Sequence, residues 1–189
     1  MSTRGFLSFA VDGETKTSYV HHSAHPEGLG LTVLAWLLTA DFAVAKSAAQ
    51  ALRVVSESDE PTAQDITRLW QYYDPNVGGR SEHPTWYQLL RGTQGDPAAI
   101  LDAGVIEDAS SFPAESLFAE WGYVIDFDTQ ALEVYCGFQE EPHDEGRFAA
   151  LAPTGDGYWP VRLTVSWPLD ALPSDAVFTD DVERAEAGA

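Results

Sequence analysis

Apolar and polar residues alternate along two stretches of the chain, and a turn signal divides each stretch. The first runs from Thr3 to His22 and contains Asp12-Gly13, a dipeptide that tolerates the positive φ angles of a tight hairpin turn. A turn at these two residues pairs Val11 with Glu14 and thereby fixes the register. The other expected pairs are Phe6 with Tyr19, Ser8 with Thr17, Arg4 with His21, Leu7 with Ser18, Phe9 with Lys16, and Thr3 with His22.

A second stretch, Trp121 to Phe138, alternates in the same way around Thr129-Gln130. Folding the chain at these two residues places every apolar side chain on one face, which favours this register. The other face is then a solvent-facing polar side, with Asp126 opposite Glu133 and Asp128 one step along. The expected pairs are Phe127 with Leu132, Ile125 with Val134, Tyr123 with Cys136, and Trp121 with Phe138.

Between the hairpins, apolar residues recur three and four positions apart, which is typical of helices. The longest such segment runs from Leu29 to Ser56, and Asp41 marks the point where it could break. Thr62 and Asp65 form a capping-box pattern at the start of a helix that Asp74-Pro75 ends. Shorter helices are expected at Thr85–Arg91 and at Pro97–Ala103, the second with Asp96 as its N-cap and Gly104 after its end.

The order of these elements predicts the fold class. Val161 to Trp167 also alternates and predicts a fifth strand. Two hairpins, this strand and the intervening helices predict an α+β fold, with an antiparallel sheet of about five strands covered by helices on one face. We expect residues 1–179 to form a single α+β domain. Residues 180–189 are acidic and alanine-rich, which favours a flexible tail.

The composition is that of a packed globular protein without disulfides. Of 189 residues, 44% are hydrophobic and 12% are aromatic. The one cysteine, Cys136, excludes an internal disulfide and a cysteine-based zinc cage, and its place in the alternation makes it a core residue. The first 20 residues carry no signal-peptide pattern, and Gly28 to Ala40, the longest apolar stretch, is too short for a membrane span. We therefore expect a cytoplasmic protein without membrane contact.

Negative charge is concentrated in the second part of the chain. The net charge is −20, and residues 1–56 contribute none of it. Between Gly92 and Gly146 there are 13 acidic residues and no Lys or Arg. Such a field repels phosphate, so we expect no direct nucleic-acid binding. Two explanations stay open: an acidic surface that only confers solubility, or one that docks a basic partner or imitates a phosphate backbone.

The open end of the first hairpin is one candidate site. Removal of Met1 would expose Ser2, whose hydroxyl could act as a nucleophile activated by its own amine. The competing explanation is a solvated rim of the sheet, since polar residues are common at strand ends. Adjacent histidines on a strand point to opposite faces and match no zinc signature, so we expect no metal and no cofactor. The catalytic candidates are Ser2, Arg4, Tyr19, His21 and His22.

Acidic residues of the second half form the other candidate site. The paired carboxylates of the second hairpin could serve as a general acid and base, or hold Mg²⁺ or Ca²⁺ loosely, or simply face solvent. The loop that follows the hairpin is acidic as well. The candidate binding residues are Asp126, Asp128, Glu133, Glu140, Glu141, Asp144 and Glu145.

Several short motifs resemble an uncharacterised family of actinobacterial and actinophage proteins. The resemblance implies no established activity. That family has a more polar segment after the position of Tyr19, whereas Val20 and His25 stand in this region here, which puts any family site there in doubt. The motifs are Thr3-Arg4-Gly5-Phe6, Val11-Asp12-Gly13, Tyr19-x-His21, Pro26-x-Gly28-Leu29-Gly30, Glu120 to Asp126, Leu132 to Gln139, and Gly146-Arg147-Phe148.

The sequence favours a non-enzymatic protein that acts through protein–protein contact, as an accessory or inhibitory factor with an acidic docking surface. One alternative is a hydrolase of the N-terminal-nucleophile type, with its site at the open end of the first hairpin. Another is a binding module for a small cationic ligand. The hydrolase requires a concave pocket around Arg4, Tyr19 and His21, whereas a docking protein needs only a surface.

Overall fold

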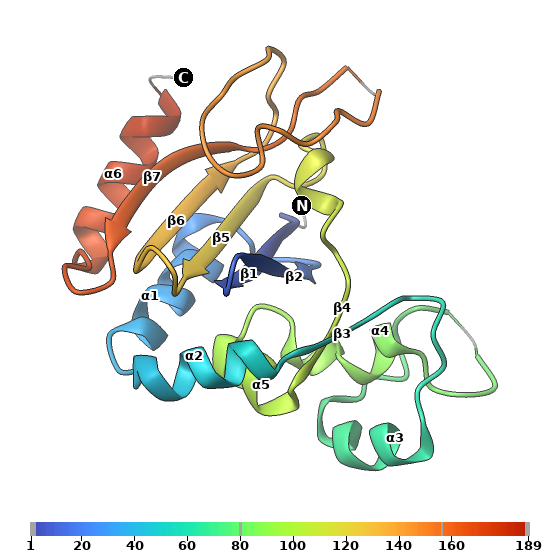
Figure 1. Ribbon diagram of the computed structural model, residues 1–189. Coiled ribbons are helices and arrows are strands. Elements are labelled where there is room, and N and C mark those ends of the chain that lie inside the picture. Colours follow the sequence, from blue (N-terminus) through green and yellow to red (C-terminus); the bar gives the residue numbers. More distant parts are fainter. Residues whose placement is uncertain (1–2, 80, 156, 188–189) are drawn as a thin grey trace.

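A five-stranded sheet forms the centre of the computed structural model, which describes residues 3–79, 81–155 and 157–187 (Figure 1). The strand order is β2-β1-β5-β6-β7. In chain order the strands are β1 (Gly5–Val11), β2 (Glu14–Val20), β5 (Trp121–Asp126), β6 (Ala131–Cys136) and β7 (Arg162–Pro168).

One pair of neighbouring strands, β1 and β5, is parallel, and all the others are antiparallel. The α+β class and the five-stranded sheet are confirmed, but the sheet is mixed, so the expectation of a purely antiparallel sheet is wrong. After β2 the chain makes a long crossover through residues 21–120 and returns beside β1 in the same direction. A connection of that length allows parallel pairing, which a tight turn cannot.

The register of the first hairpin is confirmed from Val11–Glu14 to Phe6–Tyr19. Both turn residues have positive φ, 54° at Asp12 and 78° at Gly13, as a two-residue hairpin turn requires. Pairing stops at Gly5, however, so the two outermost expected pairs, Arg4 with His21 and Thr3 with His22, do not belong to the ladder. The Thr3 carbonyl instead accepts a hydrogen bond from Ala24 N.

The register of the second hairpin differs from the expected one by two residues. Ile125 pairs with Leu132 and not with Val134, and Asp126 pairs with Ala131 and not with Glu133. The turn contains four residues, because the Asp126 carboxylate accepts hydrogen bonds from the backbone N of Asp128 and Thr129 and so closes a wider loop. A shift of two residues leaves each side chain on its face, so the alternation could not distinguish the two registers. The remaining pairs are Trp121 with Cys136, Gly122 with Tyr135, Tyr123 with Val134, and Val124 with Glu133.

The predicted helix caps are largely confirmed. Thr62 and Asp65 form a reciprocal capping box, Asp96 caps the helix that begins at Pro97, and Gly104 ends it with a φ of 63°. The α-helices are α1 (Leu31–Leu37), α2 (Phe42–Ala51), α3 (Ala63–Leu69), α4 (Trp86–Leu89), α5 (Pro97–Ala103) and α6 (Asp175–Ala187). Single turns of other helix types are η1 (Pro26–Gly30), η2 (Trp70–Tyr72), η3 (Arg91–Thr93) and η4 (Phe112–Ala114).

The expected helix from Leu29 to Ser56 is divided into three elements. Asp41 accepts hydrogen bonds from two backbone N–H groups of α2 and so begins a new helix rather than continuing α1. After α2 the chain becomes strand β3 (Arg53–Val55), which pairs in parallel with β4 (Val105–Glu107) in a separate two-stranded sheet. These segments are rich in β-branched residues, which favour a strand over a final helical turn.

The last part of the chain is helical, in contrast to the flexible tail expected from residue 180. Phe178 and Val182 of α6 are buried in the main core, and the Trp167 ring lies 5.1 Å from that of Phe178. The spacing of four residues between the two apolar side chains gives α6 one apolar stripe. This stripe anchors residues 175–187, and the expected tail therefore does not form there.

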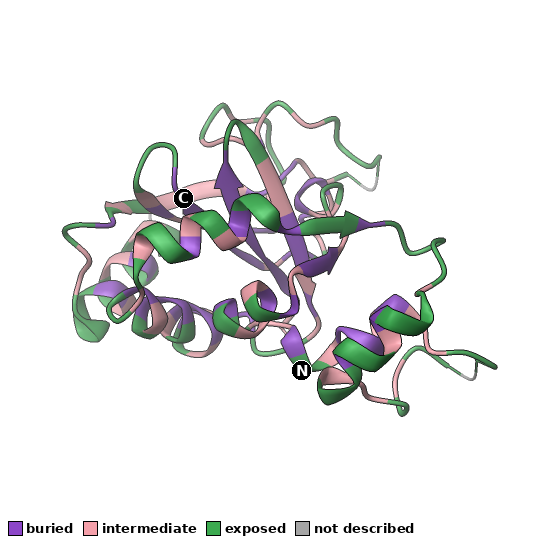
Figure 2. Cartoon of the chain, turned by 60° about the horizontal axis from the view of Figure 1, so that its bottom comes forward, coloured by how far each residue is buried: buried purple, intermediate pink, exposed green. Residues whose placement is uncertain are grey.

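Each face of the main sheet is covered. On one face, sheet residues such as Leu7, Phe9 and Ile125 share a core with residues of α1, α2 and α6. On the other face, Phe6, Val124 and Tyr135 pack against irregular segments that include Phe148 and Val161. Figure 2 accordingly shows buried residues along the central strands and exposed residues on the outer sides of the helices.

A third apolar cluster lies around α3, α4 and the small sheet, and it includes Leu69, Trp86 and Val105.

Among the described residues, no single helix is long and apolar enough to cross a membrane. The helical segments Pro26–Leu37 and Phe42–Ala51 reach that length only together, and the chain bends by 115° between them.

Candidate functional site

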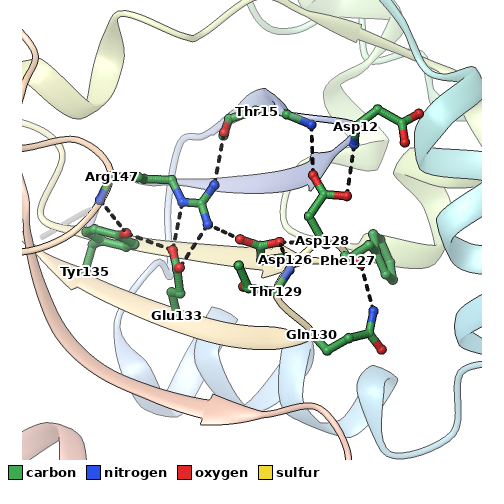
Figure 3. A network of polar contacts seen from close by, with 11 residues as sticks. Asp12, Thr15, Asp126, Phe127, Asp128, Thr129, Gln130, Glu133, Tyr135 and Arg147 are labelled. Atoms are coloured by element: carbon green, nitrogen blue, oxygen red, sulfur yellow. Dashed lines mark hydrogen bonds and ion pairs between the residues drawn. The ribbon is translucent and has the colours of Figure 1, made fainter.

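The carboxylates of the second hairpin lie in an internal network around Arg147 (Figure 3). The Arg147 guanidinium donates to both oxygens of Glu133, at 2.8 and 2.9 Å, and forms a close ion pair with Asp126. It also donates to the Thr15 hydroxyl, at 3.3 Å. The Tyr135 hydroxyl donates to Glu133 at 2.8 Å and accepts from Arg147 N at 3.2 Å. The two like charges are therefore compensated by one cation.

Asp126 is 3% exposed, so the polar face of the hairpin is not the solvent-facing side that the sequence suggested. Burial alone would raise the pKa of the Asp126 carboxyl, but hydrogen bonds from Thr129, Arg147 and Asp128 outweigh burial and lower it. Burial and the neighbouring Glu133 raise the pKa of the Tyr135 hydroxyl. Both groups are held in one protonation state at neutral pH, which suits a structural role better than proton transfer.

Asp128 links the two hairpin turns. Its carboxylate accepts hydrogen bonds from the backbone N of Asp12 and Gly13, at 3.0 and 2.8 Å. These bonds lower the pKa of Asp128. Lys46 of α2 lies 3.7 Å from the same carboxylate. Asp126, Asp128 and Glu133 thus all have partners within the chain, and the structure gives none of them a free carboxylate for a ligand.

At the open end of the first hairpin, Tyr19 lines a cavity of about 270 Å³, and Arg4, His21 and His22 are not part of its lining. Arg4 donates from its backbone N to Glu120, and its guanidinium lies 5.6 Å from the Phe118 ring centre. The Tyr19 hydroxyl lies 3.1 Å from His21 Nδ1. The expectation for Ser2 falls outside the described residues.

Electrostatics at this end disfavour a protonated histidine. Burial and the nearby charges of Arg91 and Arg4 lower the pKa of His21. Burial raises the pKa of Tyr19, and Arg4 partly opposes that rise. Within the described part of the chain, no group of three or more His, Cys, Asp or Glu side chains is placed to hold a metal ion.

The acidic loop after β6 borders a cavity with a volume of about 600 Å³. We call it the acidic cavity. Three of the predicted binding residues line this cavity, namely Glu140, Glu141 and Glu145. The fourth residue of the loop, Asp144, is exposed and does not line the cavity. The other lining residues come from four separate segments: Glu120, Trp121, Cys136, Gly137, Phe138, Gln139, Pro142, His143, Arg162 and Glu186. Five glutamates therefore surround one cavity at the end of the sheet.

Phe138 lies at the acidic cavity in an unfavourable conformation. Its side chain is 53% exposed, and its φ of 57° is uncommon for a bulky residue. Ser116 holds the backbone in this shape, because its carbonyl accepts from Phe138 N at 2.8 Å and its hydroxyl accepts from Gln139 N at 3.2 Å. Gly137 is required next to it, since a Cβ there would meet the Ala119 carbonyl oxygen at 2.3 Å. The backbone that carries an exposed aromatic ring is thus fixed beside the glutamates.

Two buried nitrogen atoms at the acidic cavity lack hydrogen bonds. Arg162 Nε is buried without a partner among the described residues. The His143 side chain is 8% exposed, and its Nε2 lies 2.8 Å from the Pro160 carbonyl oxygen. Its Nδ1 lies 3.4 Å from a Glu145 carboxylate oxygen but without hydrogen-bond geometry. Unpaired buried polar groups are costly, so a ligand that pairs with them would gain affinity.

Sequence reasoning did not find Arg147, Phe138, His143 or Arg162. A signal existed for the first, since two facing carboxylates require a nearby cation and Arg147 is the first basic residue after the acidic stretch. No signal existed for the others, because the cavity is assembled from distant segments.

No protein-family model, curated protein or solved structure matches this chain.

Proposed function

We propose that this chain is a non-enzymatic binding protein that docks a basic segment of a partner protein in the acidic cavity. The observation that carries the proposal is the cavity of about 600 Å³ lined by five glutamates, with Phe138 exposed beside them. A Lys or Arg side chain of the partner would compensate the carboxylates, and Phe138 would supply an aromatic anchor. An accessory or inhibitory role follows from such docking.

The unpaired nitrogen atoms support a peptide as the occupant. Arg162 Nε has no acceptor within the described chain and is covered from solvent, so a backbone carbonyl of the partner would gain a hydrogen bond from it by displacing the groups that cover it. The strained backbone at Phe138 supports the same conclusion, because strain of this kind persists where function requires it.

The test uses peptides that are acetylated and amidated at their ends and carry Lys or Arg in a neutral sequence. Fluorescence anisotropy measures their binding to the full chain. We expect charge reversal at the acidic loop to weaken binding by at least about tenfold, since several charge contacts are lost together. The reversed residues are Glu140→Lys, Glu141→Lys, Asp144→Lys and Glu145→Lys.

A matched control carries the same change in charge at exposed acidic residues that line no described cavity. We expect the control to bind within about twofold of the original chain, because its charges are screened by salt. Equal losses in both variants, or no binding by the unaltered chain, would refute docking in the cavity. The control residues are Glu14→Lys, Glu60→Lys, Asp170→Lys and Asp180→Lys.

A further inference from the structure

A second cavity, of about 270 Å³, lies along the free edge of β2 and shares no residue with the acidic cavity. We call it the edge cavity. It lies between the main sheet and the small sheet, because Ile106 and Glu107 of β4 line it together with Ser18 and Tyr19 of β2. Its volume is near the lower limit of known ligand pockets, ~300–1,000 Å³, so the ligand must be small.

Along the outer edge of β2, one residue at this cavity lacks partners for its backbone hydrogen-bonding groups. On the outer side of the strand, the Thr17 carbonyl accepts from Ala109 N at 3.1 Å, and His21 N donates to the Gln94 side chain at 3.3 Å. Alternate residues of a strand direct their backbone groups to the same side, so the N–H and C=O of Tyr19 also point outward. Neither has a hydrogen bond among the described residues. An amide group of a ligand would supply these partners.

Ser18 supplies a second unpaired group. The residue is 8% exposed and lines the edge cavity, and its hydroxyl makes no hydrogen bond within the described chain. Its neighbour Lys16 does not reach it, since the Lys16 ammonium donates to three carbonyls at the end of α2. The hydroxyl oxygen keeps some solvent exposure, so it can donate a hydrogen bond to a ligand in the cavity or accept one from it.

The edge cavity also holds acidic side chains without an ion pair in the described chain; Arg91 lies nearby, over the Tyr87 ring and hydrogen-bonded to Gln94. Glu57 and Glu107 both line it, and within the described chain neither forms an ion pair. Burial and the charge of Glu57 raise the pKa of Glu107. The lining also includes the acidic residues Asp108 and Glu115. The aromatic residues Tyr19, Tyr87 and Phe112 line the cavity as well, and aromatic rings favour organic cations.

We infer that the edge cavity binds a small primary ammonium compound with an adjacent amide, the chemistry shared by an amino-acid amide and the first residue of a peptide. The ammonium group pairs with Glu107, and the amide pairs with the backbone of Tyr19 and the hydroxyl of Ser18. This site is independent of the proposed docking in the acidic cavity, and the end-blocked peptides of that test carry no free ammonium group at their N-terminus.

Isothermal titration calorimetry of the full chain with L-leucinamide tests the inference. N-acetyl-leucinamide lacks the cation, and isoamylamine lacks the amide; we expect each to bind at least about tenfold more weakly, as loss of a charge-assisted contact implies. The tripeptide Leu-Gly-Gly amide identifies the source, because tighter binding than leucinamide favours a peptide N-terminus and weaker binding favours a free amine. Equal binding of leucinamide and its acetylated form would overturn the inference.

Variants locate the binding site. We expect Glu107→Gln to weaken leucinamide binding at least about tenfold and Ser18→Ala by a smaller factor of about three, in line with charged and neutral hydrogen bonds. Glu57→Gln provides a second test, because Glu57 is exposed and its change leaves the fold intact. Glu141→Gln, in the acidic cavity, should leave leucinamide binding unchanged. Undiminished binding by both Glu107→Gln and Glu57→Gln would overturn the assignment.

Discussion

Arg147 lies between the carboxylates of Asp126 and Glu133, on a face of the sheet that other segments cover. Its positive charge reduces the repulsion between them. Arg147 is itself held by five hydrogen bonds from its guanidinium and backbone to Glu133, Asp126, Thr15 and Tyr135. A buried ion pair is not necessarily a large net gain, because desolvation offsets the attraction. Removal of one partner is different, because it leaves the other charge buried and unpaired.

Arg147→Met should therefore lower the free energy of unfolding by about 3–5 kcal/mol. Urea denaturation followed by fluorescence measures the change. The control is Arg184→Met, whose exposed pair with Asp181 lies within α6 and should contribute less than about 0.5 kcal/mol. A loss at Arg147 no greater than that of the control would contradict the role assigned to the network.

Asp126 gives the stability a defined dependence on pH. Its pKa is lower in the folded chain than in the unfolded chain, so its contribution is present above the unfolded value of ~3.9 and is lost as the pH falls through the folded value. Asp126→Asn should accordingly cost stability at pH 7 and much less near pH 2. Unfolding curves of both proteins at the two pH values test this, and a constant difference would count against it.

Glu107 behaves in the opposite way. Its pKa is raised, so the ionised form destabilises the fold at neutral pH, and protonation removes the penalty as the pH falls. Glu107→Gln should raise the melting temperature at pH 7 by a few degrees while it abolishes ammonium binding. Differential scanning calorimetry checks the first part. A lower melting temperature would show that the carboxylate stabilises the chain in a way that its contacts do not reveal.

At the scale of elements, the strength of the local signal decided what the sequence could predict. Asp12-Gly13 predicted the register of the first hairpin, since both turn residues must adopt positive φ. The capping box of Thr62 and Asp65 predicted the start of α3. In the second hairpin, Thr129-Gln130 is a weak turn signal, and two registers separated by two residues expose the same faces. The Asp126 carboxylate that closes the wider turn also pairs with Arg147, and this tertiary contact has no signal in the local pattern.

The loop that carries Phe138 offers an element-scale prediction. Phe138→Asn should stabilise the chain by about 0.5–1 kcal/mol, because Asn tolerates positive φ and the exposed ring contributes little to the core. The same change should weaken binding of basic peptides, since the aromatic anchor is lost. Denaturation and anisotropy on one preparation measure both effects. A destabilised protein would show that the ring stabilises the fold and is not held there for binding.

At the scale of the whole molecule, the sequence predicted the sign and place of the charge but not its use. Of the seven acidic residues predicted to bind, Asp126, Asp128 and Glu133 proved to have partners within the chain, and the candidate sites came from segments far apart in the chain. Such convergence has no signature in local periodicity, because it depends on the crossover that follows β2. The edge cavity was missed for the same reason, since its lining residues extend from Ser18 to Glu115.

Salt should separate the two proposed sites. Binding of basic peptides to the acidic cavity should weaken steeply with added NaCl, because exposed charges are screened beyond ~8–10 Å at 0.1–0.15 M. Leucinamide in the edge cavity should lose less affinity over the same range, because Glu107 is partly buried and is screened less by salt. Titrations at low salt and at 1 M measure both slopes. A docking affinity that does not change at 1 M salt would contradict an electrostatic interface.

The parallel pairing of β1 with β5 sets the order in which the chain can fold during synthesis. The first hairpin can close soon after it leaves the ribosome, but its partner strand follows only after residues 21–120 have been made. At ~5–20 residues per second the wait is roughly 5–20 seconds. Throughout it, the apolar β1 presents an open edge and the uncovered rings of Phe6 and Phe9. Newly made chains should therefore depend on chaperones that shield such edges, and fragments that end before Trp121 should aggregate.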